Sequence, residues 1–291
     1  MAPSTSSSST TRPRPTSRPR ASWSRWPDRK RRPGLDAGPP SSSEEPGRSA
    51  ILSLHDVSKS FGALKVADAI SFDLPEGQAL GIIGPNGAGK STLFNLITGY
   101  YALTGGEIRF KGEDLSPLPT YRRNQAGIAR AFQISKPFPA LTVRENVRVG
   151  AMFGRPGARE AEDVVDQALA IAGLEELADR TAEGLTVGSL RKLEVARAYA
   201  TRPSLLLADE PCAGLNPAET EEMVGCLRKV RDLGTTVWLV EHDMKAVTSV
   251  CDRIVVIDAG QKIAEGTPQQ VVANPKVIAA YLGEPLEDKA G

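Results

Sequence analysis

Apolar and polar positions follow strand and helix periods along most of the chain after residue 50. Ile51, Leu54 and Val57 begin a strand pattern, and residues 69–74 alternate between apolar and polar side chains. Residues 78–83 form a short apolar run after the turn 75–77, and residues 107–110 follow the glycine turn 104–106. We predict strands at these four places and a helix over residues 92–97.

The second half of the chain alternates between helical and strand patterns. Residues 135–200 are mostly helical in character, because Val165, Ala168, Leu169 and Ala172 recur at the spacing of one helix face. Three later apolar runs predict buried strands, at residues 205–208, 235–240 and 253–258. An amphipathic helix is predicted from Met223, Cys226, Leu227 and Val230. Residues 267–270, Thr-Pro-Gln-Gln, form a helix capping box with proline at the first helical position.

Strand–helix alternation predicts an α/β fold in which helices cover both faces of a parallel sheet. The helical stretch of about 135–200 lies between early and late strands, so we interpret it as an inserted helical subdomain. We therefore divide the chain into a tail at 1–49, one domain at 50–283 with this insertion, and a C-terminal tail at 284–291.

Residues 1–49 are rich in Ser, Pro, Thr and Arg and almost lack aliphatic side chains, so we expect them to be disordered. Residues 1–50 hold ten basic and four acidic residues, although the net charge of the whole chain is only +1. Three interpretations stay open for this segment with its basic cluster at 29–32. It has no dedicated function, it contacts anionic lipid or nucleic acid, or it is a transit peptide.

The overall composition excludes several classes of protein. No run approaches the roughly 18 apolar residues that a membrane span needs, and 40% hydrophobic with 24% charged residues is typical of a globular protein. Two histidines make a multi-histidine metal site implausible. The three cysteines, Cys212, Cys226 and Cys251, lack C-x-x-C spacing, so we expect reduced thiols of a cytosolic protein.

A phosphate-binding loop is the clearest chemical motif. Residues 84–91 read Gly-Pro-Asn-Gly-Ala-Gly-Lys-Ser and fit G-x-x-x-x-G-K-[ST] between a predicted strand and a predicted helix. Its backbone N–H groups and the helix N-terminus would hold the phosphates, Lys90 would reach the β- and γ-phosphates, and Ser91 would ligate Mg²⁺. The nucleotide-binding set predicted here is Gly84, Pro85, Asn86, Gly87, Ala88, Gly89, Lys90, Ser91 and Thr92.

Two acids end the apolar strand 205–208, where ligands of parallel sheets bind. Asp209 suits Mg²⁺, directly or through water, and Glu210 suits a general base that activates water. His242 follows the strand 235–240 and could contact a γ-phosphate. Beside a complete phosphate loop, these residues indicate hydrolysis of a nucleoside triphosphate.

The order of these motifs resembles that of ABC-transporter ATPases over about residues 51–283. The resemblance implies a P-loop NTPase with a RecA-like core, and it assigns further roles by position. Phe61 matches the aromatic residue that stacks on adenine, and Gln133 matches the glutamine that senses Mg²⁺ and couples to membrane subunits. His242 matches the switch histidine, so the resemblance makes Glu210, His242 and Gln133 catalytic and Ser91, Gln133 and Asp209 the Mg²⁺ site.

The segment 185–189 resembles the family's L-S-G-G-Q signature, which meets the nucleotide of an opposite subunit. Here it reads Leu-Thr-Val-Gly-Ser, so Thr186 keeps a hydroxyl, Val187 adds a Cβ, Gly188 is retained and Ser189 replaces glutamine. The resemblance thereby adds Thr186, Gly188 and Ser189 to the ATP-binding set. Asn216 departs from the family's usual aspartate after the catalytic glutamate.

Several strings resemble the ATP-binding subunits of branched-chain amino acid importers in particular. They lie at residues 127–133, 210–217, 240–244 and 277–283. The resemblance implies ATP and Mg²⁺ as cofactors and a position at the cytoplasmic face of the cell membrane. It also implies a sister ATPase subunit, two membrane permeases and a periplasmic solute-binding protein, with no nucleic acid.

Residues Ile134, Lys136, Pro137 and Phe138 are candidates for the permease contact, with ordinary loop packing as the alternative. Two other functions stay open at this point. A cassette for repair or translation control finds support only in the basic tail, and a lipid-export ATPase would share much of the site.

Overall fold

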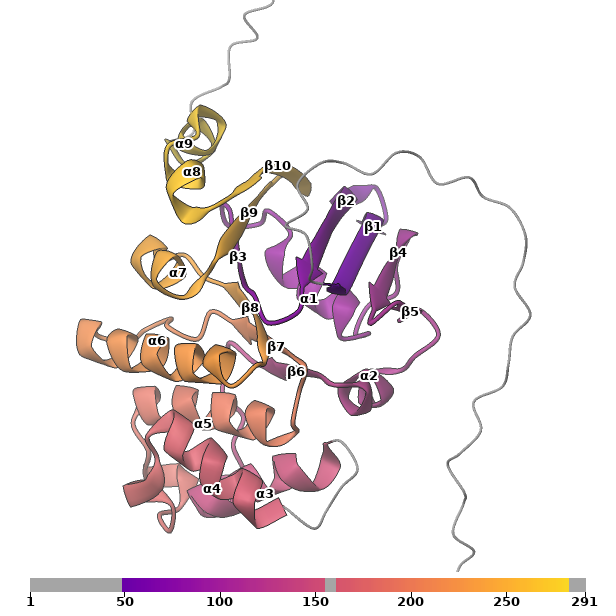
Figure 1. Cartoon of the computed structure of the whole chain (residues 1–291). Helices are drawn as coiled ribbons and strands as arrows, with labels where there is room; N and C mark the ends of the chain where they lie inside the picture. The colour runs from indigo at the N-terminus through magenta and orange to yellow at the C-terminus, as the bar shows by residue number, and fades with distance from the viewer. Residues whose placement is uncertain (1–48, 155–160, 283–291) are drawn as a thin grey trace, which may run out of the picture. The chain divides into compact units, whose positions relative to one another are not determined.

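A computed structural model describes residues 49–154 and 161–282 (Figure 1). The predicted tails at 1–49 and 284–291 lie outside these ranges, apart from Ser49. An antiparallel sheet of order β2-β1-β4-β5 comes first, built from β1 Ala50–Phe61, β2 Leu64–Pro75, β4 Gly105–Phe110 and β5 Glu113–Asp114. The strands predicted at 51–57, 69–74 and 107–110 all belong to it.

The second sheet has six strands in the order β10-β9-β3-β8-β7-β6. Its strands are β3 Ala79–Ile83, β6 Ile128–Ala131, β7 Leu205–Asp209, β8 Thr236–Val240, β9 Arg253–Asp258 and β10 Gln261–Gly266. Neighbouring strands are parallel except at the β9–β10 hairpin. Four of these strands were predicted from apolar runs, whereas β6 and β10 were not.

The helices group around the second sheet. They are α1 Lys90–Ile97, α2 Thr120–Ala126, α3 Val143–Phe153, α4 Ala161–Ala172, α5 Val187–Ala200, α6 Pro217–Asp232, α7 Met244–Val250, α8 Pro268–Val272 and α9 Pro275–Leu282, with short 3-10 turns at Glu175–Leu177 and Ala182–Gly184. Figure 1 shows α3, α4 and α5 gathered together at the bottom of the view.

The predicted helical stretch 135–200 thus contains α3, α4 and α5, and its first helix begins only at Val143. Pro137 and Pro139 disfavour an earlier start. Thr142 then caps α3 in a capping box with Glu145. The capping box predicted at 267–270 is also present, at the start of α8.

Alternate residues of the central strands feed two separate hydrophobic clusters. Val237 and Leu239 of β8 point into the cluster formed with α3–α7, whereas Trp238 and Val240 point into the cluster formed with α1 and the antiparallel sheet. The prediction of a sheet covered by helices on both faces is therefore only half right. Strands β1, β2 and β4 cover one face together with α1, because their alternating pattern gives them an apolar side of their own.

Trp238 lies at the centre of the second cluster. It is fully buried, and the rings of Phe72 and Phe94 each meet it edge-on at a centroid distance of 5.4 Å. These contacts join β2, α1 and β8 and so fix the helix that follows the phosphate loop against the sheet.

The predicted stripe at Val165, Ala168, Leu169 and Ala172 is buried, as are the predicted core residues of α6. All three cysteines are buried and free, as expected for reduced thiols. Burial raises the pKa of each thiol, to about 12 for Cys226.

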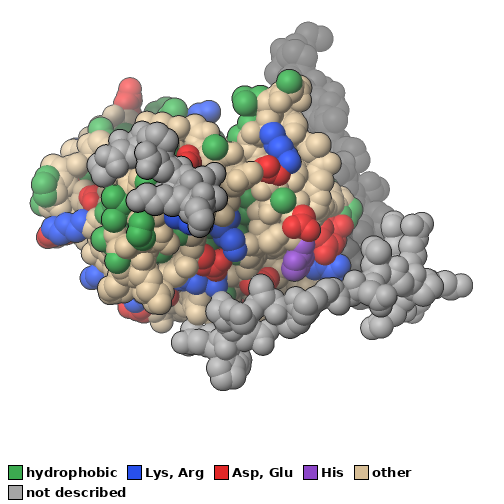
Figure 2. Space-filling view, turned by 90° about the horizontal axis from the view of Figure 1, so that it is seen from above, with side chains coloured by type: hydrophobic (Ala, Val, Ile, Leu, Met, Phe, Trp, Pro, Cys, Tyr) green, Lys and Arg blue, Asp and Glu red, His purple; other side chains and the backbone are tan. Residues whose placement is uncertain are grey.

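On the face shown in Figure 2, hydrophobic side chains lie in small groups among charged side chains of both signs. Among residues 49–154 and 161–282, no helix has the length and apolar character that crossing a membrane requires.

Candidate functional site

The predicted catalytic residues lie at one edge of the second sheet. Strands β3, β6, β7 and β8 are parallel, so their carboxyl ends meet there. The phosphate loop follows β3, Gln133 follows β6, Asp209 ends β7 with Glu210 directly after it, and His242 follows β8. The sheet therefore brings together groups that are up to 158 positions apart in the sequence, as expected at the carboxyl edge of parallel strands.

The phosphate loop depends on glycine at two close approaches. Gly84 has φ +154°, and a Cβ there would lie 1.9 Å from the carbonyl oxygen of Ile257. Gly89 has φ +102°, and its Cβ would lie 2.3 Å from the carbonyl oxygen of Val66. The loop thus passes against β9 and β2 with no room for side chains at these positions.

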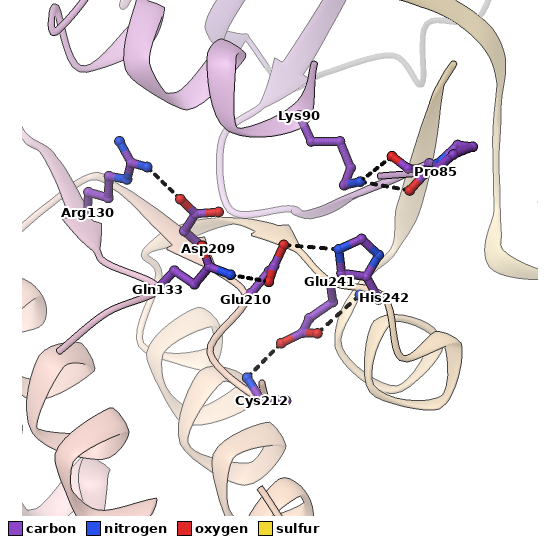
Figure 3. A network of polar contacts seen from close by, with 10 residues as sticks. Pro85, Lys90, Arg130, Gln133, Asp209, Glu210, Cys212, Glu241 and His242 are labelled. Atoms are coloured by element: carbon purple, nitrogen blue, oxygen red, sulfur yellow. Dashed lines mark hydrogen bonds and ion pairs between the residues drawn. The ribbon is translucent and has the colours of Figure 1, made fainter. Parts of the chain in front are cut away.

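Lys90 points back into its own loop. Its Nζ donates to the carbonyl oxygens of Gly84 at 2.7 Å and Pro85 at 2.8 Å, as Figure 3 shows. Burial lowers the pKa of this amine, and the charges of Glu210 and Asp209 act in the opposite direction. A buried ammonium close to two carboxylates is suited to contact a phosphate that also brings negative charge.

Glu210 lies between two other predicted catalytic side chains (Figure 3). Gln133 Nε2 donates to Glu210 Oε2 at 2.5 Å, and His242 Nε2 lies 3.0 Å from Glu210 Oε1. Glu210 also has φ +47°, an unfavourable backbone conformation for a residue with a side chain, with a cost of about 1–3 kcal/mol. Strain at a polar sheet edge is typical of a functional residue, and the three predicted catalytic residues do form one cluster.

Glu241, a buried residue that the sequence did not single out, binds the backbone on two sides of this cluster. Glu241 is 3% exposed and accepts hydrogen bonds from the backbone N–H groups of Cys212 at 2.6 Å and His242 at 3.1 Å. Burial raises the pKa of Glu241, and the two N–H groups oppose that shift. Glu241 therefore ties the segment after Glu210 to the segment that carries His242.

The three residues predicted for Mg²⁺ line one cavity of about 570 Å³. Ser91, Gln133 and Asp209 offer a hydroxyl, an amide and a carboxylate, the oxygen ligands that Mg²⁺ prefers. Asp209 is 2% exposed, and its Oδ1 is buried with no hydrogen-bond partner among the described residues. A buried carboxylate oxygen without a hydrogen-bond partner, on a residue that lines this cavity, fits a metal ligand.

Within the described ranges, no cluster of three or more His, Cys, Asp or Glu side chains could hold a metal by itself. A magnesium ion at this site would therefore depend on Ser91, Gln133 and the nucleotide phosphates as well as on Asp209.

The predicted adenine contact and the signature segment are not part of the cluster around Glu210 and do not line this cavity. Phe61 is 43% exposed at the end of β1, and its ring packs edge-on against that of Tyr101 at a centroid distance of 5.1 Å. Thr186 caps α5 by accepting from the backbone N–H of Ser189, and Gly188 packs against Glu219 of α6 rather than against the phosphate loop. Within this single chain, the signature segment does not complete the site.

The chain is similar to ABC-transporter proteins both in family models and among curated relatives. The family model described as "ABC transporter" matches residues 67–213, and the model described as "Branched-chain amino acid ATP-binding cassette transporter" matches residues 261–287. Among curated relatives, the high-affinity branched-chain amino acid transport ATP-binding protein BraF of Pseudomonas aeruginosa is 41% identical over 250 residues. LivG of Escherichia coli K12, described in the same words, is 40% identical over 250 residues. Each match covers 80% of this chain and 98% of the relative.

Solved structures agree with the fold. The ADP conformation of MJ1267, an ATP-binding cassette of an ABC transporter, has a TM-score of 0.74 at 31% identity and covers 81% of this chain and 100% of that one. A dimeric post-hydrolysis state of the cassette MJ0796, bound to ADP and Pi, has a TM-score of 0.66 at 28% identity. The match covers 75% of this chain and 98% of that one.

Proposed function

The chain belongs to the family of ABC transporter ATP-binding proteins, in the group of branched-chain amino acid transport, and we propose that it hydrolyses ATP to drive uptake of branched-chain amino acids. This assignment confirms the resemblance inferred from the sequence. The relatives are named for branched-chain amino acid transport, which favours this function over lipid export or a nucleic-acid-associated cassette.

The cluster around Glu210 is the observation that best supports hydrolysis. Its carboxylate would accept a proton from the attacking water, while Gln133 and His242 fix the direction of its two oxygens. The phosphate loop and Lys90 would hold the β- and γ-phosphates in line with that water. Bound Mg²⁺, held through Ser91, Gln133 and Asp209, would neutralise charge on the phosphates.

A second cassette would complete the site. The exposed Thr186, the buried Gly188 and the half-buried Ser189 lie at the N-terminus of α5, where backbone N–H groups favour an anion. Because these residues do not reach the phosphate loop of their own chain, we propose that they meet nucleotide bound by a sister subunit. The dimeric state described for MJ0796 supports such an arrangement.

The loop after Gln133, at residues 134–138, is the proposed docking site for a permease. Ile134 and Phe138 of this loop expose large apolar surfaces, at 70% and 44%. Movement of a docked permease segment would reach Gln133 and through it the Glu210 carboxylate at 2.5 Å. We propose that the chain acts at the cytoplasmic face of the membrane with two permeases and a periplasmic solute-binding protein.

Replacement of the proposed base tests the hydrolytic mechanism. Glu210→Gln keeps the size of the side chain but cannot accept the proton, so we expect turnover to fall by about 100-fold or more. ATP affinity should stay within about threefold of the wild type, because Glu210 is not part of the phosphate loop. Phosphate release and nucleotide titration measure the two quantities, and undiminished turnover would remove Glu210 from this role.

Uptake of labelled leucine, isoleucine and valine by a strain that lacks this subunit tests the transported solute. We expect the wild-type chain to restore uptake of at least one of them and Glu210→Gln to restore none. If the wild-type chain hydrolyses ATP but restores uptake of none of the three, the proposed solute is wrong and the ATPase assignment remains.

A further inference from the structure

Arg130 links three parts of the proposed site, although the sequence analysis gave it no role. It lies on β6, and its side chain is only 11% exposed. Its Nη2 donates to Asp209 Oδ2 at 2.5 Å (Figure 3), and its Nη1 donates to Asn95 Oδ1 on α1 at 2.7 Å. The guanidinium thereby joins the helix of the phosphate loop to the acidic end of β7.

Two aromatic rings fix the plane of the same guanidinium. Its Cζ lies 5.6 Å from the ring centroid of Phe94 and 4.9 Å from that of Phe132. Phe94 belongs to α1, and Phe132 immediately precedes Gln133. Arg130 is therefore held by cation–π contacts from two elements, and its orientation depends on both.

The pairing leaves the two oxygens of Asp209 in different states. Oδ2 is bound by Arg130, whereas Oδ1 is buried and has no hydrogen-bond partner among the described residues. Arg130 holds Oδ2 by one charge-assisted hydrogen bond, and burial of the Asp209 side chain restricts rotation of the carboxylate, so Oδ1 is also restricted in position. Arg130, Asp209, Ser91 and Gln133 line the same cavity.

We propose that Arg130 is a positioning residue of the Mg²⁺–ATP site, which holds Asp209 so that Oδ1 faces the metal. This inference rests on the proposed function, because it needs Mg²⁺–ATP as the ligand. It also gives the metal carboxylate a direct connection to α1 and to the Gln133 loop. Loss of an outer partner that orients a metal ligand typically weakens metal binding by about 10- to 100-fold.

The variant Arg130→Met removes the hydrogen bonds and keeps most of the apolar volume. In the full chain, binding of trinitrophenyl-ATP is measured once with excess Mg²⁺ and once with EDTA. We expect the dissociation constant in EDTA to stay within about twofold of wild type, because Arg130 does not contact the phosphate loop. The gain in affinity on adding Mg²⁺ should fall towards none, and the Mg²⁺ concentration for half-maximal hydrolysis should rise about tenfold or more.

Arg144→Met is a matched control. Arg144 also binds an aspartate at 2.5 Å, but its partner Asp166 is 63% exposed and the pair joins α3 to α4 away from the nucleotide. It reports the general effect of losing one Arg–Asp ion pair. We expect both its Mg²⁺-dependent gain in affinity and its Mg²⁺ midpoint to match the wild type.

Asn95→Ala gives a second test should Arg130→Met fail to fold. It leaves the ion pair with Asp209 but removes the anchor on α1, so we expect the same change in Mg²⁺ dependence to a smaller extent. The inference is overturned if folded Arg130→Met gains as much affinity from Mg²⁺ as the wild type, or more. Where only Asn95→Ala folds, the same result in that variant overturns it. A wild-type chain that binds no nucleotide with Mg²⁺ would instead overturn the proposed function.

Discussion

At the scale of single residues, the glycines of the phosphate loop differ in what they contribute. A Cβ at Gly84 would lie 1.9 Å from the Ile257 carbonyl, whereas a Cβ at Gly87 would meet nothing within 4 Å. Gly84→Ala must therefore displace β3 from β9, but Gly87→Ala meets only the strain of φ +81°. We expect losses of about 3 kcal/mol or more for Gly84→Ala and about 1–2 kcal/mol for Gly87→Ala.

Urea unfolding of the nucleotide-free chain measures both losses. Equal destabilisation by the two alanine variants would mean that backbone strain, and not the contact with Ile257, limits the loop.

Some site residues could be predicted individually and others could not. Asp209 and Glu210 were predictable because two acids directly follow an apolar strand, a local pattern. Arg130 was not, since its partners Asn95 and Asp209 are 35 and 79 positions away in the sequence. Its signal was a charged residue inside a short apolar segment, which becomes meaningful only once β6 is placed beside β7.

At the scale of elements, the N-termini of α5 and α6 depend on one another through Glu219. Glu219 and Asn216 form the capping box of α6, and a Cβ at Gly188 would lie 2.6 Å from Glu219 Oε1. Gly188→Ala would therefore push Glu219 out of the box. The cost should be about 1 kcal/mol, close to the value of a helix cap.

A double-mutant cycle with Glu219→Ala tests this dependence. With Glu219 removed, Gly188→Ala should become neutral or stabilising by up to about 1 kcal/mol, because alanine is the better helix former. Chemical denaturation of the four proteins gives the coupling. Additive effects would show that Gly188 and Glu219 do not constrain each other.

Elements with a strong apolar period were predictable, and those defined by tertiary contacts were not. Strands β3, β7, β8 and β9 are uniformly or almost uniformly buried and appear as apolar runs. β6 is only four residues long, and the edge strand β10 has no buried residue, so neither shows a clear pattern. The separate antiparallel sheet was also missed, since strand pairing depends on contacts that periodicity does not record.

At the scale of the whole molecule, the predicted site and its fold use only part of the chain. The first strand begins at Ala50, and all the predicted site residues lie between Phe61 and His242. The relatives BraF and LivG match over 98% of their own length while covering 80% of this chain. The matched part of this chain thus spans almost the full length of these relatives, and much of the remaining sequence has no counterpart in them.

We therefore expect removal of residues 1–48 to leave the cassette intact. The melting temperature should stay within about 2 °C and ATP turnover within about twofold, because the described core and all the predicted site residues lie after residue 49. Differential scanning calorimetry and phosphate release measure the two quantities.

Replacing Arg29, Lys30, Arg31 and Arg32 by serine in the full chain separates the effect of the basic cluster from that of length. Loss of ATP turnover in the shortened chain would show that the first 48 residues contribute to the nucleotide site. If the shortened and serine-substituted chains both keep turnover but lose binding to anionic vesicles, the cluster is a membrane contact that the nucleotide site does not need.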